Sequence, residues 1–166
     1  MAAETQLDLT AITTGTLIGA VQPLEIEEKD AAGAWIPTNS IMRTDRDWRV
    51  TVKWYLEGSM LGSMFFTIPG TWEVTGYLEA WGQLNVDQDL PGDSGAISVV
   101  PPPAISGSGA STRWEYTETI TITAANNPPP GPYYLAVAVT YRDAAGNPGP
   151  MAGFQDGNML QIYQPV

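Results

Sequence analysis

Apolar and polar residues alternate with a period of two along most of the chain from Pro23 onward, which is the pattern of half-buried β-strands. In the segment WRVTVKWYLE, residues 48–57, every second residue is a large apolar one and most of the residues between them are polar. β-branched and aromatic residues, which favour pleated surfaces, fill this run and its counterparts. The pattern predicts seven or eight strands, at 23–28, 48–57, 71–81, 96–100, 114–123, 133–142 and 158–163, with an additional one near 35–43.

Turn-forming residues separate these segments, as in Asp-Ala-Ala-Gly at 30–33 and Pro-Pro-Pro-Gly at 128–131. No stretch of helical length carries apolar residues at the spacing of an amphipathic helix. A single sheet would leave its large aromatic residues uncovered, so two sheets must face each other. We therefore predict an all-β fold, an antiparallel two-sheet sandwich, whose core contains Trp48, Val50, Val52, Trp54, Val74, Leu78, Ile120, Ile122, Leu135, Val137 and Val139.

The length of 166 residues suits one domain, which we place at residues 23–166. Residues 1–22 form an N-terminal extension before the first clear strand. Its Thr-rich sequence is compatible with a strand that pairs with the chain's own sheet or is exchanged with another copy. Both interpretations stay open.

Residues 131–147 resemble the penultimate strand, and the turn after it, of immunoglobulin-like and fibronectin type III domains. These families place a tyrosine near the start of that strand, two residues before an inward side chain. The resemblance implies that Tyr133 forms a tyrosine corner and that Trp48 or Trp54 is the core tryptophan. Three features depart from the pattern: the disulfide cysteines are missing, the connection 58–70 is long, and 22 residues precede the first strand. Because these folds host unrelated functions, the resemblance bears on the fold only.

The charge balance excludes several classes of partner. Seven basic residues against 18 acidic ones give a formal net charge of −11, which repels nucleic acids and anionic membrane surfaces. The N-terminus carries Glu4 and Asp8 where a secretory signal needs positive charge, and no apolar run is long enough to span a membrane. We expect a cytoplasmic protein, with export that needs no cleaved signal left open.

The sequence lacks several of the side chains that most often act in catalysis. Histidine and cysteine are both absent, which removes the commonest general base, thiolate chemistry and disulfides. Gly-Asp-Ser-Gly at 92–95 copies a serine-protease signature, but that serine needs an imidazole, so we interpret the segment as a turn. Glu73, Glu79 and Glu118 lie on predicted strands with no sign of a cleft for glycoside hydrolysis. We expect no enzymatic activity and no cofactor.

The densest group of oxygen ligands lies at 85–93, where Asn85, Asp87, Asp89 and Asp93 alternate with other residues. The glycine and closing glutamate of an EF-hand are missing from this segment. A solvated acidic loop is the expectation, and calcium bound by Asp87, Asp89 and Asp93 is the weaker alternative.

Four of the seven basic residues fall within residues 43–53. One interpretation is ion pairing with nearby acidic residues, namely Asp45, Asp47 and Glu57. The other is a positive patch of Arg43, Arg46 and Arg49 that docks on an acidic partner surface.

The segment 59–69 is unusually apolar for a connection between strands, and it either caps one end of the sandwich or forms an exposed partner site. We predict a partner site, buried only when another chain binds, made of Met60, Leu61, Phe65 and Phe66 with Leu7, Leu9 and Ile12 from the N-terminal extension.

Alternation also places four aromatic residues on the outward side of neighbouring strands: Tyr77, Trp81, Tyr134 and Tyr163. Such a surface binds sugars by stacking or anchors a protein interface, whereas scattered single aromatic residues have no special role.

Two functional hypotheses follow. The first is a non-enzymatic sandwich that acts through protein–protein contacts, as a self-assembling structural subunit or as an adaptor. The second is a carbohydrate-binding module that uses the aromatic residues, with or without calcium.

Overall fold

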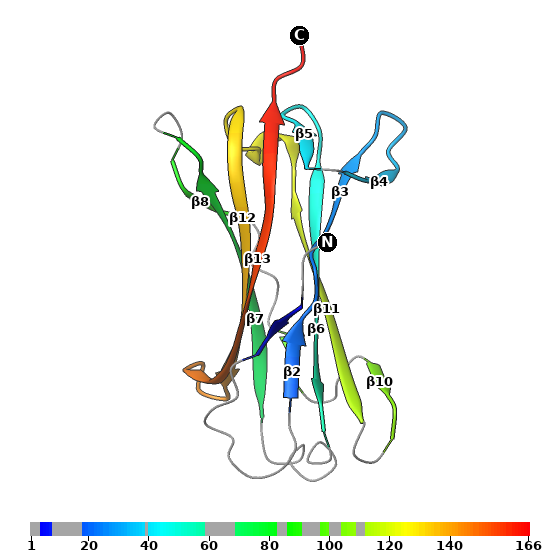
Figure 1. Cartoon of the computed structure of the whole chain (residues 1–166), viewed down its shortest axis with the longest axis vertical. Helices are drawn as coiled ribbons and strands as arrows, with labels where there is room; N and C mark the ends of the chain where they lie inside the picture. The colour runs from blue at the N-terminus through cyan, green and yellow to red at the C-terminus, as the bar shows by residue number, and fades with distance from the viewer. Residues whose placement is uncertain are drawn as a thin grey trace.

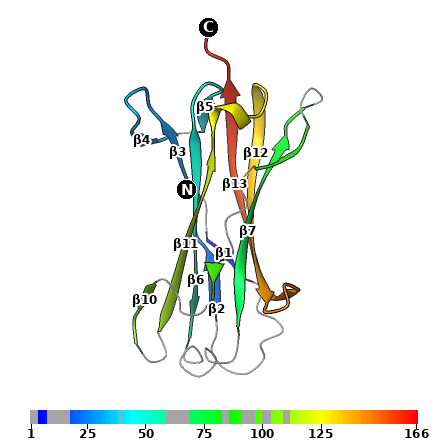
Figure 2. The same ribbon diagram turned by 180° about the vertical axis from the view of Figure 1, so that it is seen from behind.

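The computed structural model describes residues 4–7, 18–38, 40–58, 69–82, 86–90, 97–99, 104–108 and 112–166. These residues form two β-sheets that face each other as two layers, seen from opposite sides in Figures 1 and 2. Within the described ranges the helical structure is a single 3-10 turn at Ala124–Asn126. The predicted all-β sandwich is confirmed.

Sheet A contains seven strands: β1 (Thr5–Gln6), β2 (Ile18–Val21), β3 (Glu25–Lys29), β4 (Trp35–Pro37), β6 (Trp48–Glu57), β10 (Ala104–Ser106) and β11 (Arg113–Ile122). Sheet B contains six: β5 (Ile41–Arg43), β7 (Gly70–Ala80), β8 (Gln88–Asp89), β9 (Ile97–Ser98), β12 (Gly131–Asp143) and β13 (Pro148–Tyr163). The order β3-β6-β11-β10 opposite β13-β12-β7 matches the strand order of immunoglobulin-like sandwiches. One pair departs from the antiparallel prediction, because β5 runs parallel to β13.

The core lies between the sheets and is built from the predicted inward positions. All eleven predicted core residues are at most 2% exposed, which confirms the predicted registers. Trp72 and Tyr116 join Trp54 in an aromatic cluster, with the Trp54 and Tyr116 rings stacked at 5.4 Å. Offset or edge-on ring pairs of this kind stabilise a core beyond the area that they bury.

The tyrosine corner implied by the resemblance is present. Tyr133 is fully buried, and its hydroxyl donates a hydrogen bond of 2.9 Å to the carbonyl of Pro129, four residues upstream. Trp48 and Trp54 are both buried, and the indole N–H of Trp48 donates to the side chain of Asn127 at 2.7 Å. This bond ties the upper end of β6 to the segment that leads into β12.

Several strands differ from the sequence prediction. The expected strand near 35–43 is two strands in different sheets, β4 in sheet A and β5 in sheet B. The chain crosses between them close to Ser40, a non-glycine residue with a positive φ of 78°. β13 begins at Pro148, ten residues before the predicted start, and β8 and β10 were not predicted. β1 and β2 lie in the N-terminal extension, whose sequence is compatible with a strand. β1 pairs with β2, and β2 with β6, so both N-terminal strands belong to this chain's sheet A.

Glu118 is the one acidic residue at an inward position of β11, between Tyr116 and Ile120 and opposite the fully buried Val52. Its side chain is partly exposed. Burial raises the pKa of the Glu118 carboxyl above its usual value, with a smaller opposing effect from a backbone hydrogen bond at Thr119. The ionised carboxylate therefore destabilises the folded state.

We predict that Glu118→Gln will make the protein more stable at neutral pH, by up to about 1 kcal/mol. As the pH falls, the folded wild type takes up the Glu118 proton at a higher pH than the unfolded chain does, because the pKa is raised in the folded state. The wild type therefore gains stability relative to the variant over this pH range. The difference between the two proteins should shrink through that folded pKa and vanish below the unfolded value of about 4.3. Urea unfolding from pH 8 to pH 4 measures it, and a difference independent of pH would contradict the prediction.

Candidate functional site

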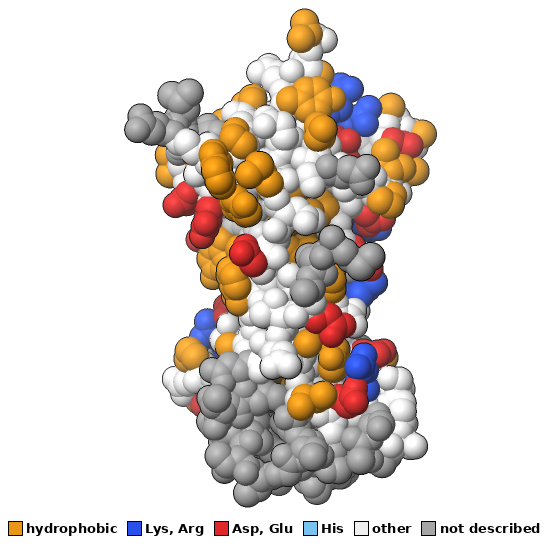
Figure 3. All heavy atoms as spheres, viewed as in Figure 1, with side chains coloured by type: hydrophobic (Ala, Val, Ile, Leu, Met, Phe, Trp, Pro, Cys, Tyr) orange, Lys and Arg blue, Asp and Glu red, His pale blue; other side chains and the backbone are white. Residues whose placement is uncertain are grey.

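The structure places the four predicted aromatic residues on the outer side of sheet B, where β13, β12 and β7 are neighbours in that order. Trp81 is 58% exposed, Tyr163 40% and Tyr77 37%, and Tyr134 is half-buried. In Figure 3, hydrophobic side chains gather over the upper parts of β12 and β13. Alternation along the strands therefore predicted the outward placement of these side chains.

Trp81 and Tyr134 form the centre of this surface. Their rings are in contact, with centroids 5.4 Å apart and planes inclined by 31°. The backbone N–H of Trp81 donates to the carbonyl of Pro132 at 3.0 Å, which holds the end of β7 against β12. The two rings thus form a continuous apolar surface that is fixed by the sheet before any ligand arrives.

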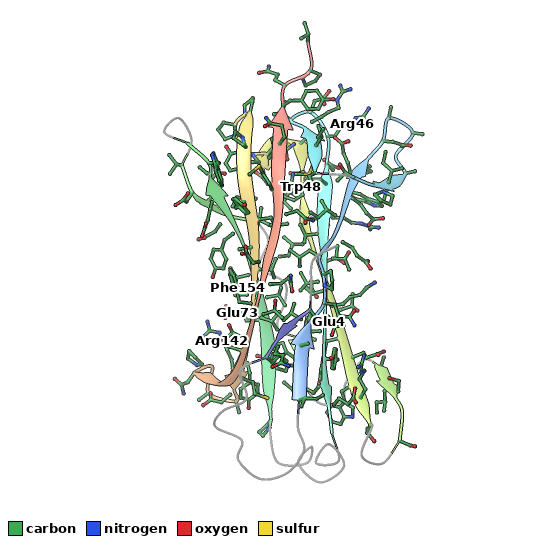
Figure 4. The ribbon with its side chains drawn as sticks, in the orientation of Figure 1. Glu4, Arg46, Trp48, Glu73, Arg142 and Phe154 are labelled. Carbon is green, nitrogen blue, oxygen red and sulfur yellow. The ribbon has the colours of Figure 1, made fainter. Side chains whose placement is uncertain are left out.

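Two further exposed apolar residues extend the surface and were not predicted from the sequence. Met159 on β13 lies opposite Tyr134 on β12, and Phe154 lies opposite Ala138. Their exposures are 45% and 47%. Figure 4 shows Phe154 on the same outer side of sheet B as Glu73 and Arg142. Phe154 was missed because the predicted last strand began at residue 158.

Small residues separate the aromatic side chains on the middle strand. Ala136 and Ala138 point outward from β12, opposite Tyr77 on β7 and Phe154 on β13 respectively. Ala136 is only 4% exposed although it faces outward, which indicates that larger neighbouring side chains overhang it. We call the set Tyr77, Trp81, Tyr134, Phe154 and Met159 the aromatic face.

Tyr163 lies apart from the aromatic face. The ladder between β12 and β13 ends at Gly131 and Ile162, and Tyr163 pairs instead with Arg43 of β5. Four residues separate Tyr163 from Met159, a distance of about 13 Å along a strand. The structure therefore groups three of the four predicted aromatic residues and leaves the fourth at the end of the sheet.

Carboxylates border the aromatic face. Glu79 lies opposite Tyr134, and Asp89 lies opposite Tyr77. Asp87 accepts a hydrogen bond of 2.8 Å from the backbone N–H of Ala80, which fixes the segment before β8 beside β7. Between them is a hollow of about 290 Å³, lined by Tyr77, Leu78, Glu79, Asp87, Gln88 and Asp89.

The calcium alternative gains no geometric support from the described residues. Asp87 and Asp89 are exposed, and Asp87 already uses one oxygen to bind a backbone N–H. Asp93 and Asn85 lie outside the described residues. Throughout the described ranges, His, Cys, Asp and Glu side chains form no group of three that could hold a metal ion.

The predicted basic patch is neutralised within the chain. Arg43 pairs with Asp45 at 2.7 Å, Arg49 with Glu27 at 2.6 Å, and Arg46 more loosely with Glu28 at 3.7 Å. Asp45 is the one expected partner found, because Asp47 pairs with Lys29 and Glu57 with Arg113. The three arginines have different surroundings. Arg43 and Arg46 line a hollow of about 350 Å³ with Lys29 and three aspartates, whereas Arg49 packs over the ring of Trp35.

The predicted apolar partner site is described only in part. Met60, Leu61, Phe65, Phe66, Leu9 and Ile12 lie outside the described residues. Leu7 was expected to be partly exposed, and this expectation is wrong: its side chain is 6% exposed and belongs to the core. The two glycines that face it, Gly19 and Gly153, leave room that a Cβ atom would fill. Leu7 therefore anchors β1 over the edge of the sandwich, between β2 and β13.

Comparisons with known proteins identify neither a family nor a relative. No protein-family model matches the chain, and no curated protein sequence does. Solved structures are similar only in fold. The C-terminal domain of Wzt shares 12% identity with a TM-score of 0.49, covering 98% of this chain and 80% of the other.

A Niemann-Pick type C2 protein from the Japanese carpenter ant shares 12% identity with a TM-score of 0.43, covering 91% of this chain and 96% of the other. A β-glucosidase from Listeria innocua, solved with glucose, shares 10% identity with a TM-score of 0.39, covering 89% of this chain but 16% of that enzyme. Function is therefore inferred from the side chains of this chain alone. Separately, the described residues contain no helix of the length and hydrophobicity needed to cross a membrane.

Proposed function

We propose that this protein is a non-enzymatic carbohydrate-binding module and that the aromatic face is its ligand surface. The contact between the exposed ring of Trp81 and the half-buried ring of Tyr134 supports the proposal most directly. Two large side chains held in contact on the outside of a sheet bury little in the core, so their placement suits a ligand better than it suits stability.

The chemistry of the face fits a sugar. A pyranose ring presents apolar C–H groups on its faces, which stack on aromatic rings, and hydroxyl groups around its edge. Trp and Tyr supply apolar surface with a polar end, and the carboxylates of Glu79, Asp87 and Asp89 accept hydrogen bonds from hydroxyl groups. The aromatic face lies on the outer side of the sheet, so a sugar chain can lie across it without threading into a cavity.

Binding without catalysis is part of the same proposal. With neither histidine nor cysteine, the side chains left for proton transfer are carboxylates, tyrosines and lysines. Glu73, one of the carboxylates considered for glycoside hydrolysis, is ion-paired with Arg142. Glu118 lies at an inward position of β11 in sheet A, whereas Glu79 is on β7 of sheet B. These three residues therefore do not gather around one cleft.

We predict that Trp81→Ala will weaken glycan binding at least about tenfold, equivalent to about 1.4 kcal/mol, because truncating a central aromatic anchor removes most of its contact. Tyr134→Ala should have a similar effect, and Trp81→Phe should keep part of the affinity. A glycan array identifies the ligand, and isothermal titration calorimetry measures its affinity for each variant.

Trp35→Ala is the matched control, because it makes the same change at a partly exposed tryptophan of sheet A. This variant should bind the glycan as the wild type does. A wild-type protein that binds no glycan on the array, or a Trp81→Ala variant with unchanged affinity, would refute the proposal.

Protein–protein contact is the second candidate function, for a structural subunit or an adaptor. One observation favours it: β10 is the edge strand of the described part of sheet A, and its Ile105 is 62% exposed. An edge strand offers backbone groups to an added strand from another chain. Light scattering after size exclusion separates the two candidates, because oligomers without a glycan signal favour protein contact and a glycan-binding monomer favours the carbohydrate module.

A further inference from the structure

The charged side chains that line the hollow beside the aromatic face are all negative. Its lining includes the carboxylates of Glu79, Asp87 and Asp89 and no basic residue. The three carboxylate residues are all exposed. The hollow adjoins the rings, because Glu79 lies opposite Tyr134 and two residues before Trp81. A sugar stacked on the rings would therefore place its neighbour close to these carboxylates.

The chain cannot neutralise these carboxylates with its own cations. It has seven basic residues, and all seven form ion pairs elsewhere, with Asp47, Asp45, Glu28, Glu27, Glu25, Glu57 and Glu73. The basic residue of β12, Arg142, is paired with Glu73 and lies opposite Thr71, eight residues along β12 from Tyr134. None of these seven side chains is left to neutralise the hollow, so a cationic ligand would meet carboxylates that no Lys or Arg side chain compensates.

We propose that the aromatic face selects amino sugars, with a sugar ring stacked on Trp81 and Tyr134 and a protonated amine of the glycan in the carboxylate-lined hollow. This inference rests on the proposed carbohydrate-binding function and adds the class of ligand. An ammonium group donates up to three hydrogen bonds and is attracted by the carboxylates that line the hollow. A uronic acid at the same place would be repelled by them.

The length of the site favours an oligosaccharide. Glu79, on the near side of the hollow, adjoins the rings, whereas Tyr77 and Asp89, on its far side, lie four residues along β7 from Trp81, which is about 13 Å along a strand. A glycan that covers the rings and fills the whole hollow therefore needs more than one unit, so single sugars should bind more weakly than oligosaccharides. The aromatic rings then contribute contact area that any pyranose can use, and the hollow supplies the discrimination by charge.

The test compares three oligosaccharides of equal length by calorimetry: a glucosamine oligomer, an N-acetylglucosamine oligomer and a galacturonate oligomer. We expect the glucosamine oligomer to bind most tightly and the galacturonate oligomer to show no binding. The preference for the amine over the N-acetyl form should fall as salt rises from low to molar concentration, because salt screens charges on an open surface.

The double variant Glu79→Gln with Asp89→Asn removes two charges and changes the shape of the hollow little. Each exposed ion pair contributes up to about fivefold to the affinity for the amine. In the double variant, the ratio of amine to N-acetyl affinity should therefore fall by roughly threefold to tenfold. Glu115→Gln, which removes one charge from the outer side of sheet A, should leave that ratio unchanged.

The outcomes separate this inference from the proposed function. Equal affinities for the glucosamine and N-acetylglucosamine oligomers, with both lost in Trp81→Ala, would overturn the charge selectivity and leave the carbohydrate module standing. Binding of the glucosamine oligomer that is unchanged in Trp81→Ala would also overturn the charge selectivity. The amine would then be attracted by the carboxylates without any stacking on the aromatic face. A wild-type protein that binds no glycan at all overturns the proposed function itself.

Discussion

Val137→Asp will leave the chain unfolded at room temperature. Val137 is fully buried on β12, the strand with partners on both sides in sheet B. Its neighbours at the next inward positions, Leu135 and Val139, are also fully buried, so a carboxylate there would meet neither water nor a partner. The cost of burying an unpaired charge exceeds the roughly 5–15 kcal/mol by which most domains are stable.

Circular dichroism and urea unfolding measure this effect. Thr119→Asp is the control, because it introduces the same carboxylate at an exposed position of β11 and should shift the unfolding free energy by no more than about 0.5 kcal/mol. Val137→Ala should fold and lose about 2 kcal/mol, which shows that the site tolerates a loss of volume better than a charge. A folded Val137→Asp with the melting temperature of the wild type would mean that the inward register of β12 is off by one residue.

The core was predictable because long strands repeat the same signal many times. In β6, β7, β11 and β12 the large apolar residues fall on one parity over ten or more positions, so one misfit such as Glu118 does not change the register. The same alternation placed Tyr77, Trp81 and Tyr134 on the outer side of sheet B. The face to which a side chain points depends on its position within its own strand, so it can be predicted from the sequence.

Other features depend on contacts between distant segments, which alternation does not encode. The two-residue strand β1 is too short to show any period, and it is held by Leu7 and by a 2.9 Å hydrogen bond between Thr5 and Gln155. The ion pairs of Arg46 and Arg49 join them to Glu28 and Glu27 on β3, across the sheet and not along the chain. Their neutralisation therefore became visible only with the strand pairing.

The first half of β13 was missed because its sequence, PGPMAGFQDG, has the composition of a loop. The structure gives two of its glycines a role in close packing. A Cβ atom on Gly153 would come within 2.3 Å of the Leu7 side chain, and one on Gly157 within 1.9 Å of the carbonyl oxygen of Leu135. Glycine here marks positions where another part of the chain approaches closely, which is the alternative reading of glycine inside a strand.

Gly157→Val will destabilise the protein by at least about 3 kcal/mol. The register between β12 and β13 shifts by one residue between Tyr134 and Ala136, so Gly157 and Asn158 together lie opposite Leu135 in a β-bulge. A side chain at Gly157 would collide with backbone and not with a movable side chain, so the two strands would have to separate or the bulge would have to move. Gly157→Ala should show the same effect to a smaller degree.

The bulge also links stability to the proposed binding surface. It determines which face of sheet B the residues before it and after it occupy. Phe154 and Met159 are an odd number of residues apart and still share the outer face, which is possible only with one extra residue between them. Moving the bulge past either one would turn that side chain to the other face. Gly157→Ala should therefore lose glycan affinity along with stability, whereas Asn158→Ala, at the exposed neighbouring position, should change neither. Urea unfolding and calorimetry on the same two variants measure both effects, and a Gly157→Ala protein as stable as the wild type would mean that the strands do not pair in this register.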